Sequence, residues 1–295
     1  MTDLTKYPLT ADDIRIRDPF IMPHNGKYYL TGTNADYNVI FVVYVSEDLI
    51  HWSEAKTIYT PTPDMADTLE YWAPEMYAYN GKYYLFGTIN REGDYRGTYV
   101  LVSDTPDGEY KMWSEGPVTL EHWMCLDGTL YFEDGKPYMI FCHEWLQVCD
   151  GTMCYVPLTD DLKKACGNPR LMFSATDASW CRAISSNNGA KYPCYITDGP
   201  CMYQSSNGKL YMLWSSKGDG GYTVGIAVSS NGKLDGEWTQ LEKPLFGANG
   251  GHCGIFKNFD GQYYLSLHQP NDRPLERMKL YRFGEDADGV PCILD

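Results

Sequence analysis

Apolar and polar residues alternate along most of this chain, and the alternation recurs in five similar stretches. Each stretch combines a small or acidic residue beside Pro or Gly, a short apolar run, a glycine turn and a second apolar run. The five are DPFIMPHNGKYYL from Asp18, WAPEMYAYNGKYYLFGT from Trp72, LDGTLYFEDGKPYMIFC from Leu126, TDGPCMYQSSNGKLYMLWSS from Thr197 and GHCGIFKNFDGQYYLSLHQP from Gly251. Period-two alternation interrupted by Gly, Asn and Asp predicts β-hairpins, and helical periodicity is nearly absent. The sequence therefore predicts an all-β chain.

The five repeats are spaced almost evenly. Their turn glycines are Gly26, Gly81, Gly135, Gly208 and Gly261, which lie 55, 54, 73 and 53 residues apart. Several strands in each unit of roughly 40–50 residues or slightly more are typical of propeller blades. We therefore predict a single five-bladed β-propeller domain over residues 1–295, with blades near 15–65, 66–118, 119–165, 190–245 and 246–295. The wide third interval predicts an insertion at about 165–195.

Charge and cysteine usage narrow the possible partners and the compartment. The formal net charge is −15, which argues against binding to nucleic acid or to an anionic membrane surface. The chain has no run of 18 apolar residues, so we expect no transmembrane helix. Its 10 cysteines form no CxxC pair, which excludes an ordinary zinc site. The first residues contain no basic and apolar leader, so we expect a cytoplasmic protein with reduced thiols.

Chemistry-bearing residues recur at the start of the first strand of each repeat. Counting back eight residues from the turn glycine gives Asp18, Ala73 and Asp127, and similar counts give Asp198 and His252. The innermost strands of a propeller line one central channel, so equivalent positions converge on its axis. One carboxylate beside Pro or Gly would be only a turn signal. Three carboxylates and a histidine at one repeat position predict a reactive site instead.

The motifs RDPF, WAPE, LDGTLYFEDGKPY, TDGP and GGHCGIF resemble those of glycoside hydrolase family 43, the five-bladed β-propeller arabinosidases and xylosidases. The resemblance covers about residues 15–283. It implies an inverting hydrolase in which Asp18 is the general base, while Asp127 orients the general acid and tunes its pKa. An inverting pair must leave room for a water molecule beside the sugar, with the two carboxyl groups about 6.5–9.5 Å apart.

The motifs offer three residues for the general acid. The family carries a Glu in an EGP-like motif of the fourth blade, whereas this chain has Asp198 there, which is shorter by one methylene group. Glu144, in CHEWLQ on the third blade, and Glu75, in WAPE, are alternative acids. His252 in GGHCG resembles a family histidine near a central cation, so the resemblance implies Ca²⁺ on the axis and no organic cofactor.

Aromatic and charged residues outside this ring are candidates for sugar binding. Trp72, Trp145 and Trp180 are candidate stacking platforms, although each could equally pack in the core. Glu75 and Arg277 are candidate contacts to sugar hydroxyls. The resemblance implies release of terminal arabinofuranose or xylose from oligosaccharides of plant-cell-wall type. A galactan- or galactofuranose-directed hydrolase and a carbohydrate-binding propeller without catalysis are the alternatives, and the oligomeric state stays open.

Overall fold

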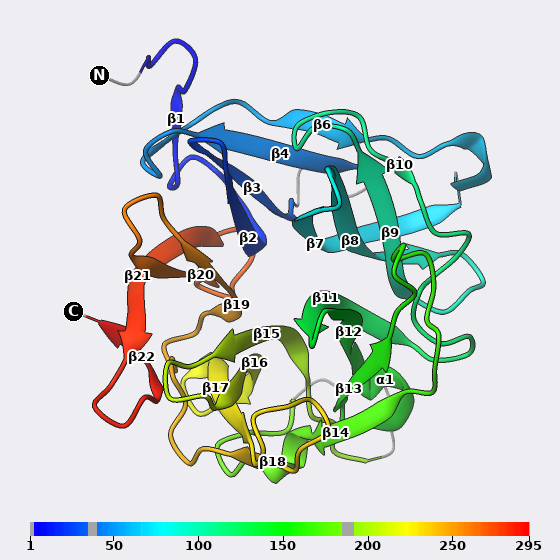
Figure 1. The fold of residues 1–295 in the computed structure, drawn as a ribbon, viewed down its shortest axis with the longest axis vertical. Coiled ribbons are helices and arrows are strands. Elements are labelled where there is room, and N and C mark those ends of the chain that lie inside the picture. The colour runs from blue at the N-terminus through cyan, green and yellow to red at the C-terminus, as the bar shows by residue number, and fades with distance from the viewer. Residues whose placement is uncertain (1–2, 35–39, 66, 185–191, 295) are drawn as a thin grey trace.

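The computed structural model describes residues 3–34, 40–65, 67–184 and 192–294, which form five antiparallel sheets in a ring (Figure 1). The first sheet contains β1 (Leu9–Thr10), β2 (Arg17–His24), β3 (Lys27–Thr33), β4 (Phe41–Ser46), β5 (His51–Trp52) and β6 (Lys56–Tyr59). The second contains β7 (Thr68–Tyr79), β8 (Lys82–Arg91), β9 (Gly97–Ser103) and β10 (Lys111–Met112). The prediction of an all-β, five-bladed propeller is confirmed.

The other three sheets repeat the four-stranded plan. The third contains β11 (Cys125–Glu133), β12 (Lys136–His143), β13 (Thr152–Pro157) and β14 (Arg170–Ser174). The fourth contains β15 (Asp198–Gln204), β16 (Leu210–Gly218), β17 (Gly221–Ser229) and β18 (Trp238–Gln240), and the fifth contains β19 (Gly251–Lys257), β20 (Tyr263–Gln269), β21 (Arg277–Glu285) and β22 (Pro291–Leu294). The short helices are η1 (Pro63–Met65), α1 (Trp145–Val148) and η2 (Ala175–Asp177). No helix in the described part of the chain has the length and apolar character of a membrane span.

Local sequence explains the hairpins that join the first two strands of the first three sheets. Asn25 and Gly26 both have positive φ, at 47° and 75°, and Asp134 and Gly135 repeat the pattern at 51° and 77°. Two-residue turns with positive φ at both positions match the right-handed twist of the strands that they join. The turn motifs therefore fix the register of the inner hairpins, such as His24 opposite Lys27.

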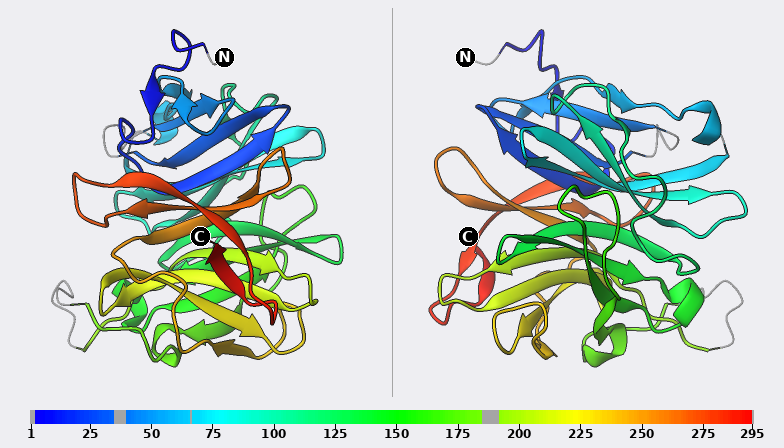
Figure 2. Two further views of the ribbon diagram at one scale, coloured as in Figure 1. Left: turned by 90° about the vertical axis from the view of Figure 1, so that its left-hand side faces the viewer. Right: turned by 45° about the vertical axis from the view of Figure 1, so that its right-hand side comes forward.

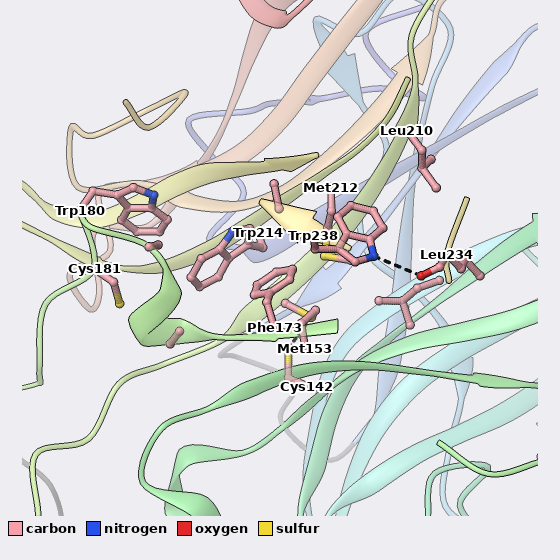
Figure 3. Close-up of a cluster of buried hydrophobic side chains, with 14 of the residues drawn as sticks. Cys142, Met153, Phe173, Trp180, Cys181, Leu210, Met212, Trp214, Leu234 and Trp238 are labelled. Carbon is pink, nitrogen blue, oxygen red and sulfur yellow. Dashed lines mark hydrogen bonds between the residues drawn. The ribbon is translucent and has the colours of Figure 1, made fainter. Parts of the chain in front are cut away.

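Apolar side chains pack between neighbouring sheets, with one cluster at each of the five junctions. Figure 3 shows the cluster between the third and fourth sheets, where Phe173, Trp214 and Trp238 meet. Each sheet is therefore buried on both faces, as stacked propeller blades require. This packing leaves only the strand ends and the connecting loops to form a site.

The ring closes between the first and fifth sheets. The termini lie at the outer part of these sheets (Figures 1 and 2). β1 pairs with β5 of its own sheet and does not join the fifth sheet. Closure therefore depends on contacts between the first and fifth sheets nearer the axis, including an isolated bridge between Arg15 and Arg277. Glu276 is fully buried there, with its carboxylate oxygens 3.4 Å from Arg15 Nε and 3.5 Å from Arg17 Nη1.

The segment that we expected as an insertion has mixed structure. Its residues 170–174 form β14, the outermost strand of the third sheet. Residues 175–184 continue through η2 toward the fourth sheet, while residues 185–191 lie outside the described residues. Much of the extra length therefore belongs to the outer part of one sheet.

Candidate active site

Every inner strand is interrupted by a bulge near its first residues. The ladder register shifts between Arg17 and Phe20 in β2, and shifts of the same kind occur in β7, β11, β15 and β19. The residues with positive φ at these bulges are Asp18 (53°), Ala73 (43°), Asp127 (57°), Gly199 (50°) and His252 (50°). Bulges redirect side chains and are common beside active sites.

This register corrects one step of the sequence analysis. We expected Asp198 at the same ring position as Asp18 and Asp127, but Gly199 holds that position in the fourth sheet. Asp198 lies one residue earlier and pairs with Ser215. A Cβ at Gly199 would lie 2.7 Å from the ring of His252, so the close packing of that ring requires glycine.

A hydrogen-bond relay fixes the bulges from one sheet to the next. The second strand of a sheet supplies a side-chain acceptor for the bulge N–H of the following sheet. Thr33 Oγ1 accepts from Ala73 N (2.7 Å), Thr88 Oγ1 from Asp127 N (2.9 Å), Ser215 Oγ from His252 N (2.8 Å) and His268 Nδ1 from Asp18 N (3.1 Å). The strained residues therefore depend on their neighbours for alignment.

The third sheet departs from this relay. Cys142 occupies the position of these acceptors, opposite Leu126, and its thiol instead contacts Met153 Sδ at 3.7 Å. Gly199 N therefore donates to the carboxylate of Asp127, at 3.0 Å from Oδ2. This bond ties a carboxylate of the third sheet to the backbone that carries Asp198.

The bulges border a cavity of about 350 Å³ at one end of the ring. Seven of the residues singled out from the sequence line it: Asp18, Trp72, Asp127, Glu144, Trp145, Asp198 and His252. A concave space with convergent polar groups is the usual form of a small-molecule site. The fold thus brings together most of the candidates that the spacing of the motifs indicated.

Asp18 is held in its ionised form. Thr33 Oγ1 donates to Asp18 Oδ2 at 2.6 Å, and His252 Nδ1 lies 3.1 Å from Oδ1. Burial alone would raise the pKa of Asp18, but the charge and hydrogen bond of His252, together with Arg17, hold that pKa well below its usual range. The carboxylate is therefore a base that stays available throughout the neutral and mildly acidic range.

His252 and His268 differ in charge although both face Asp18. Burial opposes protonation of His252, but Asp18 and Asp127 outweigh it and raise its pKa to about 10. Burial lowers the pKa of His268 to about 4. His268 accepts from the Asp18 N–H at Nδ1, and its Nε2 lies 2.9 Å from Asn271 Oδ1, as expected for a neutral ring that donates from Nε2.

Asp198 is held in the opposite state. Burial raises its pKa to about 7, and the nearby Asp127 adds to this effect. His252 and a hydrogen bond of 2.9 Å from the Tyr222 hydroxyl to Asp198 Oδ2 act in the other direction. Burial also raises the pKa of Asp127, as does the neighbouring Asp18. Asp198 can therefore carry a proton near neutral pH.

Glu144, the alternative acid, is bound as an ion pair. Arg96 Nη1 lies 2.6 Å from Glu144 Oε1 and 2.7 Å from Oε2. The guanidinium also lies over the indole of Trp72, 4.1 Å from the ring centroid. Burial raises the pKa of Glu144 while Arg96 opposes that shift. Its carboxylate therefore positions Arg96 and Trp72 at the cavity wall.

Glu75, the other alternative acid, is not among the residues that line the cavity. Thr129 Oγ1 donates to Glu75 Oε1 at 2.9 Å, and the Tyr77 hydroxyl donates to Oε2. Burial raises the pKa of Glu75 to about 7. The residue follows the bulge of β7, so it lies further along the inner strand than Ala73.

Two candidate sugar contacts lie elsewhere. Trp180 is 7% exposed and packs in the core, with its ring 4.9 Å from Trp214 and against the backbone of Gly225. Arg277 Nε donates to the carbonyl of Asp12, so this side chain holds the N-terminal segment. The cavity is lined instead by Arg273, whose side chain is 69% exposed.

Calcium on the axis stays a prediction. Among the described residues, no group of three or more His, Cys, Asp or Glu side chains could hold a metal ion. His252 Nδ1 lies 3.1 Å from Asp18 Oδ1, so this ring nitrogen is not free to bind a metal ion directly. A cation bound through water molecules would be detected if a chelator lowered activity and Ca²⁺ restored it.

Several residues of the site were missed by sequence reasoning. Tyr222 follows the turn at Asp219 and Gly220, and Arg96 lies between β8 and β9 in the segment INREGDYRGT, where no repeat marks either of them. The relay acceptors carry a signal that could have been used, because Thr33 and Thr88 end the similar motifs YYLTGT and YYLFGT. Comparing the second strands of the repeats would have found them.

Comparisons with known proteins agree with this geometry. A crystal structure described as that of an endo-arabinase from Bacteroides thetaiotaomicron VPI-5482 is 37% identical, with a TM-score of 0.89, over 96% of this chain and 99% of that chain. The alpha-L-arabinofuranosidase 43 of Humicola insolens is 24% identical over 247 residues, 79% of this chain and 48% of that relative. The chain thus spans about half the length of this relative.

The expectation of a cytoplasmic protein is wrong. An extracellular exo-alpha-(1->5)-L-arabinofuranosidase of Streptomyces chartreusis is 27% identical over 246 residues, 79% of this chain and 70% of the relative. Two further relatives are also named as extracellular enzymes, and these names contradict the expectation. The cysteine content suggested a reducing compartment. Six of the ten free thiols are buried, however, where oxidants cannot reach them easily, so free thiols do not require such a compartment.

The family follows from the whole sequence rather than from single motifs. The sequence profile described as Glycosyl hydrolases family 43 matches residues 13–290, which include the inner strands of all five sheets and the carboxylates of the cavity. The chain belongs to glycosyl hydrolases family 43.

Proposed function

We propose that this protein hydrolyses the glycosidic bonds of α-linked L-arabinofuranose chains with inversion of configuration. The observation that carries the proposal is a pair of carboxyl groups that line one cavity and whose pKa values are shifted in opposite directions. His252 and Arg17 keep Asp18 ionised against the effect of burial, whereas Asp198 has a pKa of about 7. Separated pKa values of this kind distinguish the base from the acid in a hydrolase.

In the proposed mechanism, Asp18 accepts a proton from a water molecule that attacks the anomeric carbon. Asp198 donates its proton to the leaving oxygen, so the sugar alcohol departs without a negative charge. Asp127 raises the pKa of Asp198, and its bond to Gly199 N fixes the backbone beside the acid. After release of the products, Asp18 returns its proton to solvent and Asp198 is protonated again.

The comparisons support arabinose as the sugar. The relative that is 37% identical is described as an endo-arabinase, and the curated relatives above are named arabinofuranosidases. Trp72 and Trp145 offer aromatic surface at the cavity wall for the apolar face of a sugar. Arabinofuranose therefore has better support than xylose or galactofuranose.

A substrate panel followed by NMR tests this proposal. The panel contains linear arabino-, xylo- and galacto-oligosaccharides and the nitrophenyl furanosides and pyranosides of the same sugars. We expect turnover of arabinofuranosides above all, with the inverted anomer in the first product. The retained anomer would contradict the mechanism, because it requires a nucleophilic carboxylate about 5–5.5 Å from the acid. Sugar affinity without any product would instead favour the binding propeller.

A further inference from the structure

A second cavity lies beside the catalytic one, above the junction of the second and third sheets. It encloses about 400 Å³ and is lined by the loop at Asp94–Arg96 and by the segment that leads into β11, including His122 and Trp123. Arg96 lines both cavities. The two spaces are therefore neighbours that share Arg96 as part of their walls.

The walls of this second cavity are aromatic and well supported. Trp123 stacks on His143, with ring centroids 4.1 Å apart and an interplanar angle of 14°. One face of the indole is thereby covered. Tyr95 is 43% exposed and meets His122 edge-on at 6.5 Å. Flat, partly exposed rings of this kind provide contact area with little loss of side-chain freedom on binding.

One glutamine connects the second cavity to the first. Gln147 Oε1 accepts from Met124 N at 2.8 Å and lies 2.7 Å from His143 Nε2, while its Nε2 donates to the carbonyl of His122 at 2.9 Å. Gln147 belongs to α1, whose residues Trp145 and Leu146 line the catalytic cavity. The walls of both cavities are therefore parts of one connected unit.

The chemistry of the lining fits a neutral chain rich in hydroxyl groups. Asp94, Thr119 and Glu121 offer oxygen atoms beside the aromatic rings, and the net charge of −15 disfavours an anionic ligand. A sugar presents an apolar face and a rim of hydroxyl groups, which matches rings flanked by carboxylates. Because Arg96 lines both cavities, an occupant of the second cavity lies next to an occupant of the catalytic one.

We propose that the second cavity binds further sugar units of the same chain that is cleaved in the first, with Trp123 and Tyr95 as its stacking surfaces. This inference rests on the proposed function and deepens it, because it makes the protein selective for long linear chains over short glycosides. An aryl glycoside occupies only the catalytic cavity, so its hydrolysis should not depend on the second cavity.

The test compares the wild type with Trp123→Ala and Tyr95→Ala on arabino-oligosaccharides of increasing length and on nitrophenyl arabinofuranoside. For the wild type, kcat/KM should rise with chain length. Both variants should lose about tenfold on the long chains, equal to about 1.4 kcal/mol, and stay within about twofold on the aryl glycoside. Tyr95→Ala guards against misfolding of Trp123→Ala, because Tyr95 is exposed.

Tyr263→Ala is the matched control, since Tyr263 is also a partly exposed ring, at 37%, but lies in the fifth sheet. An unchanged length dependence in both cavity variants would overturn the inference, as would an equal loss on the aryl glycoside. If no substrate is cleaved, the proposed function fails, and the second cavity is then tested on its own by electrophoresis of the proteins through a gel that contains debranched arabinan. If arabinan retards the wild type and Tyr263→Ala but neither cavity variant, the second cavity binds the polysaccharide. Equal retardation of all four proteins would refute the inference.

Discussion

The inner edge of the first sheet and that of the fourth present carboxylates in opposite states. Asp18 sits on its bulge, accepts a hydrogen bond from Thr33 and faces the charged His252. Asp198 precedes its bulge, accepts a hydrogen bond from Tyr222 and is influenced by Asp127. One carboxylate has cationic neighbours and the other has an anionic one.

This difference shows how a repeated backbone can support two roles. Both strands carry the same register shift, so the scaffold alone does not distinguish base from acid. The distinction comes from which position of the bulge bears the carboxylate and from the charges of the neighbouring sheets. Each prediction below removes one of these contributions.

Loss of the base should have the largest effect. Asp18→Asn keeps the size of the side chain but cannot accept the proton from water, so kcat should fall by about 10²–10⁴-fold, the range for a general base. Steady-state kinetics on an arabino-oligosaccharide measure this loss, and circular dichroism checks the fold. Near-normal turnover would remove Asp18 from the mechanism.

Loss of the acid should depend on the leaving group. Asp198→Asn should reduce cleavage of a natural oligosaccharide by about 10²–10³-fold but cost much less on a dinitrophenyl glycoside, whose phenolate departs without a proton. Glu144→Gln is the matched comparison, because it weakens the pairing with Arg96 and should affect both substrates alike. A selective loss in Glu144→Gln would assign the acid to the third sheet.

Removing the positive charge between the carboxylates should move both limbs of the pH profile. His252 lowers the pKa of Asp18 and that of Asp198. In His252→Gln both pKa values rise, so kcat/KM should fall at low pH where the wild type is still active, while the alkaline limb moves upward. We expect about a tenfold loss at pH 5 relative to pH 7. A profile that keeps the wild-type shape would mean that His252 is neutral.

The smallest expected effect concerns the tyrosine beside the acid. The hydroxyl of Tyr222 stabilises the ionised form of Asp198, so Tyr222→Phe should raise the pKa of Asp198 above its value of about 7. The alkaline limb of kcat/KM should shift to higher pH, with a loss of kcat of about threefold from poorer orientation of the acid. A limb that moves downward would contradict the assigned hydrogen bond.

The repeats allowed the fold and most of the cavity residues to be predicted, because turn chemistry and period-two alternation act locally. The position of Asp198 was displaced by one residue because a bulge depends on pairing with a second strand, which spacing does not reveal. For Trp180 the sequence left sugar binding and core packing open, because an aromatic residue has the same pattern in a core and in a cleft, and the structure places it in the core. Tyr222 and Arg96 follow loops, where no periodicity marks a functional side chain.

The hydrogen bond from Asp18 N to His268 Nδ1 has a consequence for the order in which the site is completed. The two residues are 250 positions apart in the sequence, and Ser266 Oγ also donates to the carbonyl of Pro19 at 2.7 Å. During synthesis Asp18 is made early, whereas His268 and Ser266 are made near the end of the chain. Bringing these residues together closes a long loop, which costs conformational entropy. The catalytic base therefore comes into alignment only when the fifth sheet docks, so a chain that has lost that sheet would keep the RDPF motif without a working base.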